Sequence, residues 1–233
     1  MKAFVHHVTL QWKLDLRNKN VLLPYYIIPL IFFLVMSAVF NSIMPDYDLV
    51  LIPSMIVFSV TMAAVLGMPV TLFEIYGTDV KKMFHLGNVP HYVPMAVSVV
   101  SSFVHFLTLS VLITGLGSLI YGASLPGNVG LFIVGMLGFV LASEGVGVLI
   151  GVFARKQSDI AIMGQAVFLP SVILSGSMFP ADMLPKPLQY VSYVLPAALG
   201  MNAMNDGTVW MMLVLVGIML VSLTVSFFKT KQL

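Results

Sequence analysis

The sequence predicts an all-α membrane protein with six transmembrane helices, and its composition and long apolar runs support this. Of its 233 residues, 59% are hydrophobic and only 9% are charged, and the mean hydropathy is +1.03. Soluble domains carry about 25% charged residues, so this chain has too little polar surface to be stable in water. At about 20 residues per helical crossing, six crossings leave room for loops and ends but not for a second catalytic domain.

Six long apolar runs supply the predicted crossings. Each is at least 20 residues long, and five of the six contain no charged side chain. Such runs are too long and too apolar for the buried helix of a soluble core. The runs cover residues 22–43, 49–72, 93–120, 129–153, 160–179 and 209–228.

The basic residues predict the orientation of these spans, because Lys and Arg near span ends are retained on the cytoplasmic side. If the N-terminus is cytoplasmic, Lys186 is the only basic residue in the outer segments. The inner segments then hold all the other basic residues, namely Lys2, Lys13, Arg17, Lys19, Lys81, Lys82, Arg155, Lys156, Lys229 and Lys231. We therefore expect both termini to be cytoplasmic.

Residues 1–20 are predicted to form an amphipathic interfacial helix. On a helical wheel the apolar arc and the polar arc are separate, and such a helix lies in the plane of the membrane interface. The apolar arc holds Phe4, Val5, Val8, Trp12 and Leu16, and the polar arc holds Lys2, His6, Thr9, Lys13 and Arg17. This helix could be a membrane-surface anchor, a docking surface for a cytoplasmic partner, or both.

The loop at residues 73–92 is predicted to contain a short helix. Thr78 can cap its N-terminus, Asp79 suits the positive end of the helix dipole, and Gly87 and Pro90 would end it. A short helix of this kind would present Lys81, Lys82 and His85 to the cytoplasm. The alternative is an ordinary basic loop between two spans.

Glu144 is the one carboxylate inside an apolar run, so we expect it to face the protein interior. Ser143, Gly147 and Gly151 recur at every fourth position beside it and predict close helix packing. A buried, hydrogen-bonded Glu144 is the favoured interpretation, and a substrate or proton role is the alternative.

The third run carries Ser98, Ser101, His105 and Thr108 on one helical face. This face is expected to pack on another helix or to line a wet path rather than to contact lipid. Pro29 and Pro170 fall inside the first and fifth runs, where each removes a helix hydrogen bond and favours a kink.

Two motifs resemble those of ABC-2 type transporter permeases. The first is the E-x-x-G-T...P segment formed by Glu74, Gly77, Thr78 and Pro90. It departs from the common form at Phe73, Ile75 and Asp79, since many members carry Arg beside the Glu and Leu after the Thr. The second resembles the signature at the end of span five, and its residues are Ser175, Gly176, Phe179, Pro180, Leu184 and Pro185.

The resemblance covers essentially the whole chain and implies one transmembrane domain over residues 1–233. It implies a subunit that works as a homodimer or heterodimer with a second permease, above two ATP-binding subunits. The loop 73–92 would be the coupling loop, and residues 180–208 would be outer short helices that partly re-enter the membrane. The coupling residues would be Glu74, Gly77, Thr78, Lys81 and Lys82, and the route would run along spans one, two and five.

The expected function is that of an ATP-driven exporter subunit for a hydrophobic or amphipathic compound such as a drug, peptide or lipid. The chain has no phosphate-binding G-x-x-x-x-G-K-[ST] loop, so ATP and magnesium are expected on the partner ATPase. No cofactor, metal site, catalytic residue or nucleic acid is expected on this chain, which contains no cysteine. The expected location is the bacterial cytoplasmic membrane, as a multi-pass protein in contact with lipid.

Two other classes of function remain as alternatives. An intramembrane hydrolase would need a nucleophile with a positioned base, and Ser175 with His105 is the pairing to consider; no H-E-x-x-H metalloprotease motif occurs. The second alternative is a structural membrane subunit that carries no substrate itself. Glu144 and His105 are the candidates for an intramembrane polar site.

Overall fold

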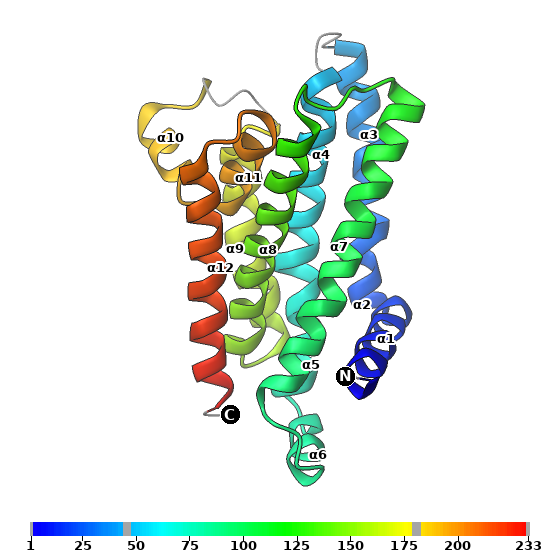
Figure 1. The fold of residues 1–233 in the computed structure, drawn as a ribbon, viewed down its shortest axis with the longest axis vertical. Coiled ribbons are helices and arrows are strands. Elements are labelled where there is room, and N and C mark those ends of the chain that lie inside the picture. Colours follow the sequence, from blue (N-terminus) through cyan, green and yellow to red (C-terminus); the bar gives the residue numbers. More distant parts are fainter. Residues whose placement is uncertain (1, 44–47, 179–182, 232–233) are drawn as a thin grey trace.

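The computed structural model describes residues 2–43, 48–178 and 183–231, and all regular elements in these ranges are helices (Figure 1). Six of the helical stretches are long and apolar enough to cross a membrane, which confirms the predicted number. We number them as spans one to six: Lys19–Ile43, Leu49–Tyr76, Tyr92–Tyr121, Val129–Phe153, Gln157–Leu174 and Val209–Thr230.

Spans one and two each contain one wide π-helical turn. Span one is composed of α2 (Lys19–Leu22), the π turn η1 (Leu23–Ile27) and α3 (Ile28–Ile43). Span two is composed of α4 (Asp48–Met62), the π turn η3 (Ala63–Gly67) and α5 (Met68–Tyr76).

Each π turn ends two residues before a proline, Pro29 in span one and Pro69 in span two. Proline has no amide hydrogen to donate and disturbs the regular helix ladder before it. A Cβ on Gly67 would lie 2.5 Å from a ring carbon of Tyr25, so the glycine lets the two π turns approach each other. Span five, in contrast, passes through Pro170 as one helix, α9 (Gln157–Leu174).

Span two lies at the centre of the helix bundle. In its most apolar stretch 83% of residues are buried, compared with 28% in span one, 33% in span five and 17% in span six. Span three is α7 (Tyr92–Tyr121) and span four is α8 (Val129–Phe153), and both pack on span two. Spans one, five and six therefore keep most of their surface for lipid or for other chains.

The two ends of the bundle carry different short helices (Figure 1). The N-terminal helix α1 (Lys2–Arg17), α6 (Val80–Leu86) and the end of α12 (Val209–Thr230) lie at one end. Helices α10 (Lys186–Ser192) and α11 (Pro196–Asn205) lie at the other end. Short helices in the described part of 180–208 agree with the sequence prediction.

Helix α11 folds back into the bundle against α8. A Cβ on Gly200 would lie 2.4 Å from the ring of Phe139, and a Cβ on Gly135 would lie 2.6 Å from the backbone of Ala203. These two glycines allow the helices to pack with their backbones close together.

The predicted end of span five was wrong. Helix α9 ends at Leu174, with Ser175 as its C-cap, rather than continuing to residue 179. Gly176 has a φ of 81°, in the left-handed region that glycine adopts without strain. The glycine thus reverses the chain direction before a further turn can form, and Phe179 and Pro180 lie outside the described residues.

Candidate functional site

The coupling segment, which we define as residues 73–92, forms a sharp turn at the end of span two and then a short helix. Gly77 donates its amide to the Phe73 carbonyl at 2.7 Å, and a Cβ at this position would lie 2.4 Å from the Phe73 ring. The Thr78 hydroxyl accepts a hydrogen bond from the Val80 amide, where α6 begins. The prediction of a short helix in this loop is confirmed.

Helix α6 projects beyond the bundle (Figure 1) and exposes the Lys82 side chain. Lys82 and Asp79 form an ion pair at 2.7 Å with both side chains exposed, while Lys81 is half-buried. The segment after α6 turns back at Asn88, whose φ of 53° marks the reversal, rather than at Gly87. Nothing is described of the His85 side chain.

Glu74 links the coupling segment to the junction between α1 and α2. The Asn18 side-chain amide donates to both carboxylate oxygens of Glu74, at 3.0 and 3.2 Å. The Asn18 side-chain oxygen also accepts from the Asn20 amide at 3.1 Å and caps α2. Asn18 therefore connects the start of span one to the end of span two.

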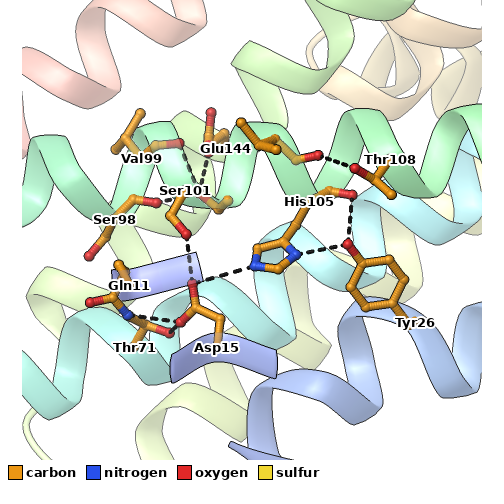
Figure 2. Close-up of polar contacts among 12 residues, drawn as sticks. Gln11, Asp15, Tyr26, Thr71, Ser98, Val99, Ser101, His105, Thr108 and Glu144 are labelled. Atoms are coloured by element: carbon orange, nitrogen blue, oxygen red, sulfur yellow. Dashed lines mark hydrogen bonds and ion pairs between the residues drawn. The ribbon is translucent and has the colours of Figure 1, made fainter. Parts of the chain in front are cut away.

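A second polar group, buried inside the bundle, surrounds the Asp15 side chain of α1 (Figure 2). Its carboxylate is 4% exposed and accepts hydrogen bonds from Gln11 at 2.9 Å, Ser101 at 3.0 Å and Thr71 at 3.2 Å. The donors come from α1, span three and span two, so the carboxylate joins three elements. We define the buried polar cluster as Gln11, Asp15, Tyr26, Thr71, Ser101 and His105.

His105 occupies the other side of this cluster (Figure 2). Its Nδ1 lies 2.8 Å from the Tyr26 hydroxyl, and its Nε2 lies 3.7 Å from an oxygen of Asp15. The Trp12 ring stacks on the imidazole with ring centres 5.4 Å apart. Helix α1 thus closes over His105 with an aromatic ring and a carboxylate.

Burial sets the protonation behaviour of Asp15, which lies outside the spans. Removal of the carboxylate from water raises its pKa above the ordinary value of 3.8, and the hydrogen bonds from Gln11, Ser101 and Thr71 oppose this rise. Nearby Glu74 adds a further increase through charge repulsion.

The predicted apolar arc of α1 lies partly against the bundle and partly on the surface. Of the predicted apolar arc, Val8, Trp12 and Leu16 are half-buried, whereas Phe4 and Val5 are exposed. Asp15, which sequence reasoning did not select, is the one buried residue among positions 4–17 of this helix. The available signal was that Asp15 lies three positions after Trp12 and four after Gln11, on the same helical face as both.

Glu144 faces the protein interior, as predicted. It is 1% exposed and accepts a hydrogen bond from the Ser102 hydroxyl of span three, which also lies close to the Ser98 and Val99 carbonyls. Its second oxygen, Oε2, has no hydrogen-bond partner among the described residues. The arrangement is that of a buried carboxylate held by a neighbouring helix.

The small-residue stripe beside Glu144 provides the predicted close packing. A Cβ on Gly147 would lie 2.1 Å from the Ala64 carbonyl oxygen, and one on Gly151 would lie 2.8 Å from Leu72. Ser143 is buried on the same helix. Spans two and four therefore touch through their backbones.

The polar face of span three is mostly buried, with one exception. Ser98, Ser101 and His105 are buried, as expected, but Thr108 is exposed. The Thr108 hydroxyl donates to the Val104 carbonyl at 2.8 Å, so its polar group is satisfied within its own helix. Thr108 is thus the exposed member of this face and lies next to Tyr26 of span one.

Three aromatic rings join spans one, two and five. Phe32 stacks on Phe58 with ring centres 3.6 Å apart, and Phe58 meets Phe168 edge to face at 5.4 Å. Next to these rings span five exposes Gln165, a polar side chain inside a long apolar helix. A polar group in that position favours contact with water or another chain over contact with lipid.

The signature after span five is partly described. Ser175 donates to the Val172 carbonyl at 2.8 Å and lies 2.7 Å from the Ser177 hydroxyl, and both serines are buried. Pro185 precedes the first residue of α10, and Leu184 is half-buried. Ser175 is thus engaged within its own turn, and its hydrogen bonds do not include His105, so the geometry gives no support to a Ser–His hydrolase.

These features define a class: a multi-pass helical membrane protein with a short helix projecting from one end and a folded-back helix at the other. A profile of the ABC-2 type transporter family matches residues 3–208, which is most of the chain. The chain therefore belongs to the ABC-2 type transporter family.

Individual relatives agree with this assignment. The chain is 27% identical over 136 residues to "Inner membrane transport permease YhhJ" of Escherichia coli (strain K12), a match that covers 58% of the chain and 32% of the relative. It is 40% identical over 60 residues to "Probable multidrug ABC transporter permease YbhS" of the same strain, which covers 25% and 16%. It is 30% identical over 89 residues to "ABC transporter G family member 20" of Dictyostelium discoideum, which covers 37% and 12%. The chain spans about a third or less of the length of these relatives.

Proposed function

We propose that this chain is the permease subunit of an ATP-driven exporter and that a separate ATPase subunit drives it through the coupling segment. The observation that carries this proposal is the position of α6. It follows span two, which lies at the centre of the bundle, after a turn of three residues, and it projects beyond the bundle end with Lys82 exposed. A force on α6 would therefore act on the central span.

The link between Asn18 and Glu74 supports this proposal. It joins the end of span two to the start of span one, so displacement of α6 would be shared by both spans. Gly77, Thr78, Lys81 and Lys82 would then shape and present the docking surface. Two ATPase copies, each holding ATP and magnesium, would serve a dimer of permease subunits.

The proposed route runs along spans one, two and five. The contacts Phe32–Phe58 and Phe58–Phe168 join these three spans, and exposed Gln165 lies on span five. Since span two is largely buried, most of the free surface belongs to spans one and five. This surface suits a hydrophobic or amphipathic substrate such as a drug, peptide or lipid, with α10 and α11 capping the outer end.

The orientation belongs to the same proposal, with α1, α6 and the end of α12 in the cytoplasm of a bacterial cell. The chain contains no cysteine, so single cysteines report the side directly. Lys82→Cys should react with a membrane-impermeant maleimide only in inside-out vesicles, and Ser124→Cys only in right-side-out vesicles. The reverse pattern would invert the assignment.

Co-purification tests the coupling. The probe is the Walker-type ATPase encoded next to this chain, where such a reading frame exists. Replacement of residues 77–86 by a Gly/Ser loop of equal length should abolish co-purification and substrate-stimulated ATP turnover. The same replacement at residues 124–127, at the other end of the bundle, is the control and should leave both intact. Unchanged binding and turnover in the 77–86 variant would refute the coupling role.

Substrate crosslinking separates an exporter from a structural subunit that carries no substrate. A photoreactive amphipathic dye should label spans one and five in an ATP-dependent manner and accumulate in inside-out vesicles. Labelling confined to a partner chain would favour the structural alternative.

A further inference from the structure

Two neighbouring pockets open at the α6 end of the bundle. The larger, about 820 Å³, lies between the coupling segment and the end of span six. The smaller, about 410 Å³, lies between the ends of spans two, four and six. Tyr76 and Lys81 line both pockets, so the two form one continuous surface.

This surface carries a concentration of positive charge. Five of the eleven basic residues of the chain line it, and none of its described lining residues is acidic. The five are Lys81, Lys82, Arg155, Lys229 and Lys231. Only Lys82 has an ion-pair partner among the described residues, the exposed Asp79. Lys81, Arg155, Lys229 and Lys231 form no ion pair with a carboxylate among the described residues, although Asp159 accepts a hydrogen bond from the Arg155 backbone amide at 3.0 Å. Cations without a paired carboxylate favour an anionic ligand.

The walls of the larger pocket are apolar. Ile75, Phe84, Val89 and Pro94 line it together with the lysines. His91 meets Phe227 of span six with ring centres 5.3 Å apart, which holds the coupling segment against that span. The surface thus combines apolar walls with cations, and it matches a molecule with an anionic head and an apolar tail.

The pockets lie at the depth where the spans end. Tyr76 is the last residue of α5, Phe153 the last of α8 and Thr230 the last of α12, and each lines one of the pockets. Span ends lie at the level of the lipid headgroups, and basic pockets between spans at this level bind anionic headgroups. The exposed side of α6, including Met83 at 72% exposure, remains available for a protein partner.

We propose that this surface binds an anionic phospholipid. The headgroup phosphate lies among Lys81, Arg155 and Lys229 at the span ends, and the acyl chains extend from there toward the membrane interior past Phe153, the exposed last residue of span four. The lipid then connects the coupling segment to spans four and six, which have no hydrogen bond or ion pair to α6 among the described residues. This site is additional to the substrate route along spans one, two and five.

Native mass spectrometry of the full chain in detergent tests the proposal. The probes are dioleoyl-phosphatidylglycerol and dioleoyl-phosphatidylcholine. The pocket variant is Lys81→Gln/Arg155→Gln/Lys229→Gln, and the control variant Lys13→Gln/Arg17→Gln/Lys19→Gln removes the same charge from exposed positions on α1 and α2. Each cation near an anionic lipid surface contributes about a fivefold preference in binding affinity for anionic over zwitterionic lipid. The wild type and the control should therefore bind phosphatidylglycerol at least about fivefold more tightly than phosphatidylcholine, and the pocket variant should lose that preference.

Three outcomes would overturn the proposal. Equal loss of preference in both triple variants would show general surface attraction instead of a site. Displacement of the lipid by inorganic phosphate at equal concentration would show a site for free anions. Unchanged lipid preference in the pocket variant, together with loss of ATPase co-purification, would assign the surface to a protein partner. Melting temperatures measured in phosphatidylcholine confirm that each variant is folded.

Discussion

The buried polar cluster and the coupling segment lie at the same end of the bundle, yet they use their polar side chains in opposite ways. Asp15 is 4% exposed and accepts hydrogen bonds from three elements, whereas the Asp79 side chain is 88% exposed and pairs only with Lys82 of the same segment. A buried hydrogen-bonded carboxylate is costly to disturb, and an exposed pair contributes little to stability. The cluster therefore fixes α1 to the bundle, while the Lys82–Asp79 pair of the coupling segment stays exposed to solvent, where another molecule can reach it.

The largest effect on stability is expected at Gly147, where the backbones of spans two and four pack closely beside the buried Glu144. Gly147→Ala places a Cβ 2.1 Å from the Ala64 carbonyl oxygen, so α8 must move and Glu144 moves with it. We expect a loss of about 2–3 kcal/mol in the free energy of unfolding, as for other overpacked positions. SDS titration of the purified protein measures it.

Gly115→Ala is the matched control, because nothing lies within 4 Å of the added Cβ on the helical position Gly115. The free energy of unfolding of this variant should rise by up to about 1 kcal/mol, because alanine has a better helix propensity than glycine. Equal stability of the two variants would contradict the close contact between spans two and four.

Asp15→Ala is expected to have the next largest effect. It leaves Gln11, Thr71 and Ser101 without their acceptor, and an unsatisfied buried polar group costs about 1–3 kcal/mol. Since the two hydroxyls can turn to backbone carbonyls of their own helices, we expect a total near 2 kcal/mol. Helix α1 should detach, and trypsin should cleave after Lys13 and Arg17 faster than in the wild type. In Asp79→Ala, the exposed control, cleavage at these sites should not change.

Asp15→Asn tests the pH dependence of the same cluster. Burial raises the pKa of Asp15, so the folded protein binds the proton more tightly than the unfolded chain does. The stability contributed by Asp15 is therefore complete below the ordinary pKa of 3.8 and is lost as pH rises through the raised value. The free energy of unfolding should be measured for the wild type and for Asp15→Asn between pH 4 and 7. The wild-type value minus the variant value should fall as the pH rises, by at most about 1.4 kcal/mol per pH unit.

The comparison of the two proteins keeps the other ionisable groups near Asp15 in place. His105 belongs to the same cluster and Glu74 lies beside it, and both remain in both proteins. A flat difference across this range would show that the carboxyl does not gain its proton on folding.

The two regions also differ in how far the sequence could predict them. The six spans and α6 follow from local patterns: long apolar runs, a threonine near the start of α6 and a glycine after it. The role of Asp15 depends on where α1 lies against span three, and the burial of Glu144 was predictable because a charge in an apolar run must face inward. The two π turns and the stop at Leu174 depend on contacts between spans, such as Gly67 with Tyr25, that no local pattern contains.

A substitution at the Asn18–Glu74 hydrogen bond, which connects the two regions, should have a smaller effect on stability. Asn18→Asp keeps the cap of α2 but removes the amide donor and places a carboxylate beside Glu74. We expect a loss of about 1 kcal/mol from the missing bond and the repulsion. The double variant Asn18→Asp/Glu74→Gln restores a donor on the opposite side and should recover most of the loss. Without that recovery, the contact between these two side chains would not be the source of the effect.

The smallest effect on stability is expected at the exposed ion pair. Lys82→Ala breaks the pair with Asp79, and because both side chains are exposed the free energy of unfolding should change by less than about 0.5 kcal/mol. If α6 is the docking surface, the same variant should weaken co-purification of the ATPase although the permease is as stable as the wild type. Asp15→Ala should show the reverse order, with stability reduced more than ATPase binding. Measuring both quantities on both variants tells whether stability and docking are separate properties of the two regions, and a parallel loss in both variants would show that they are not.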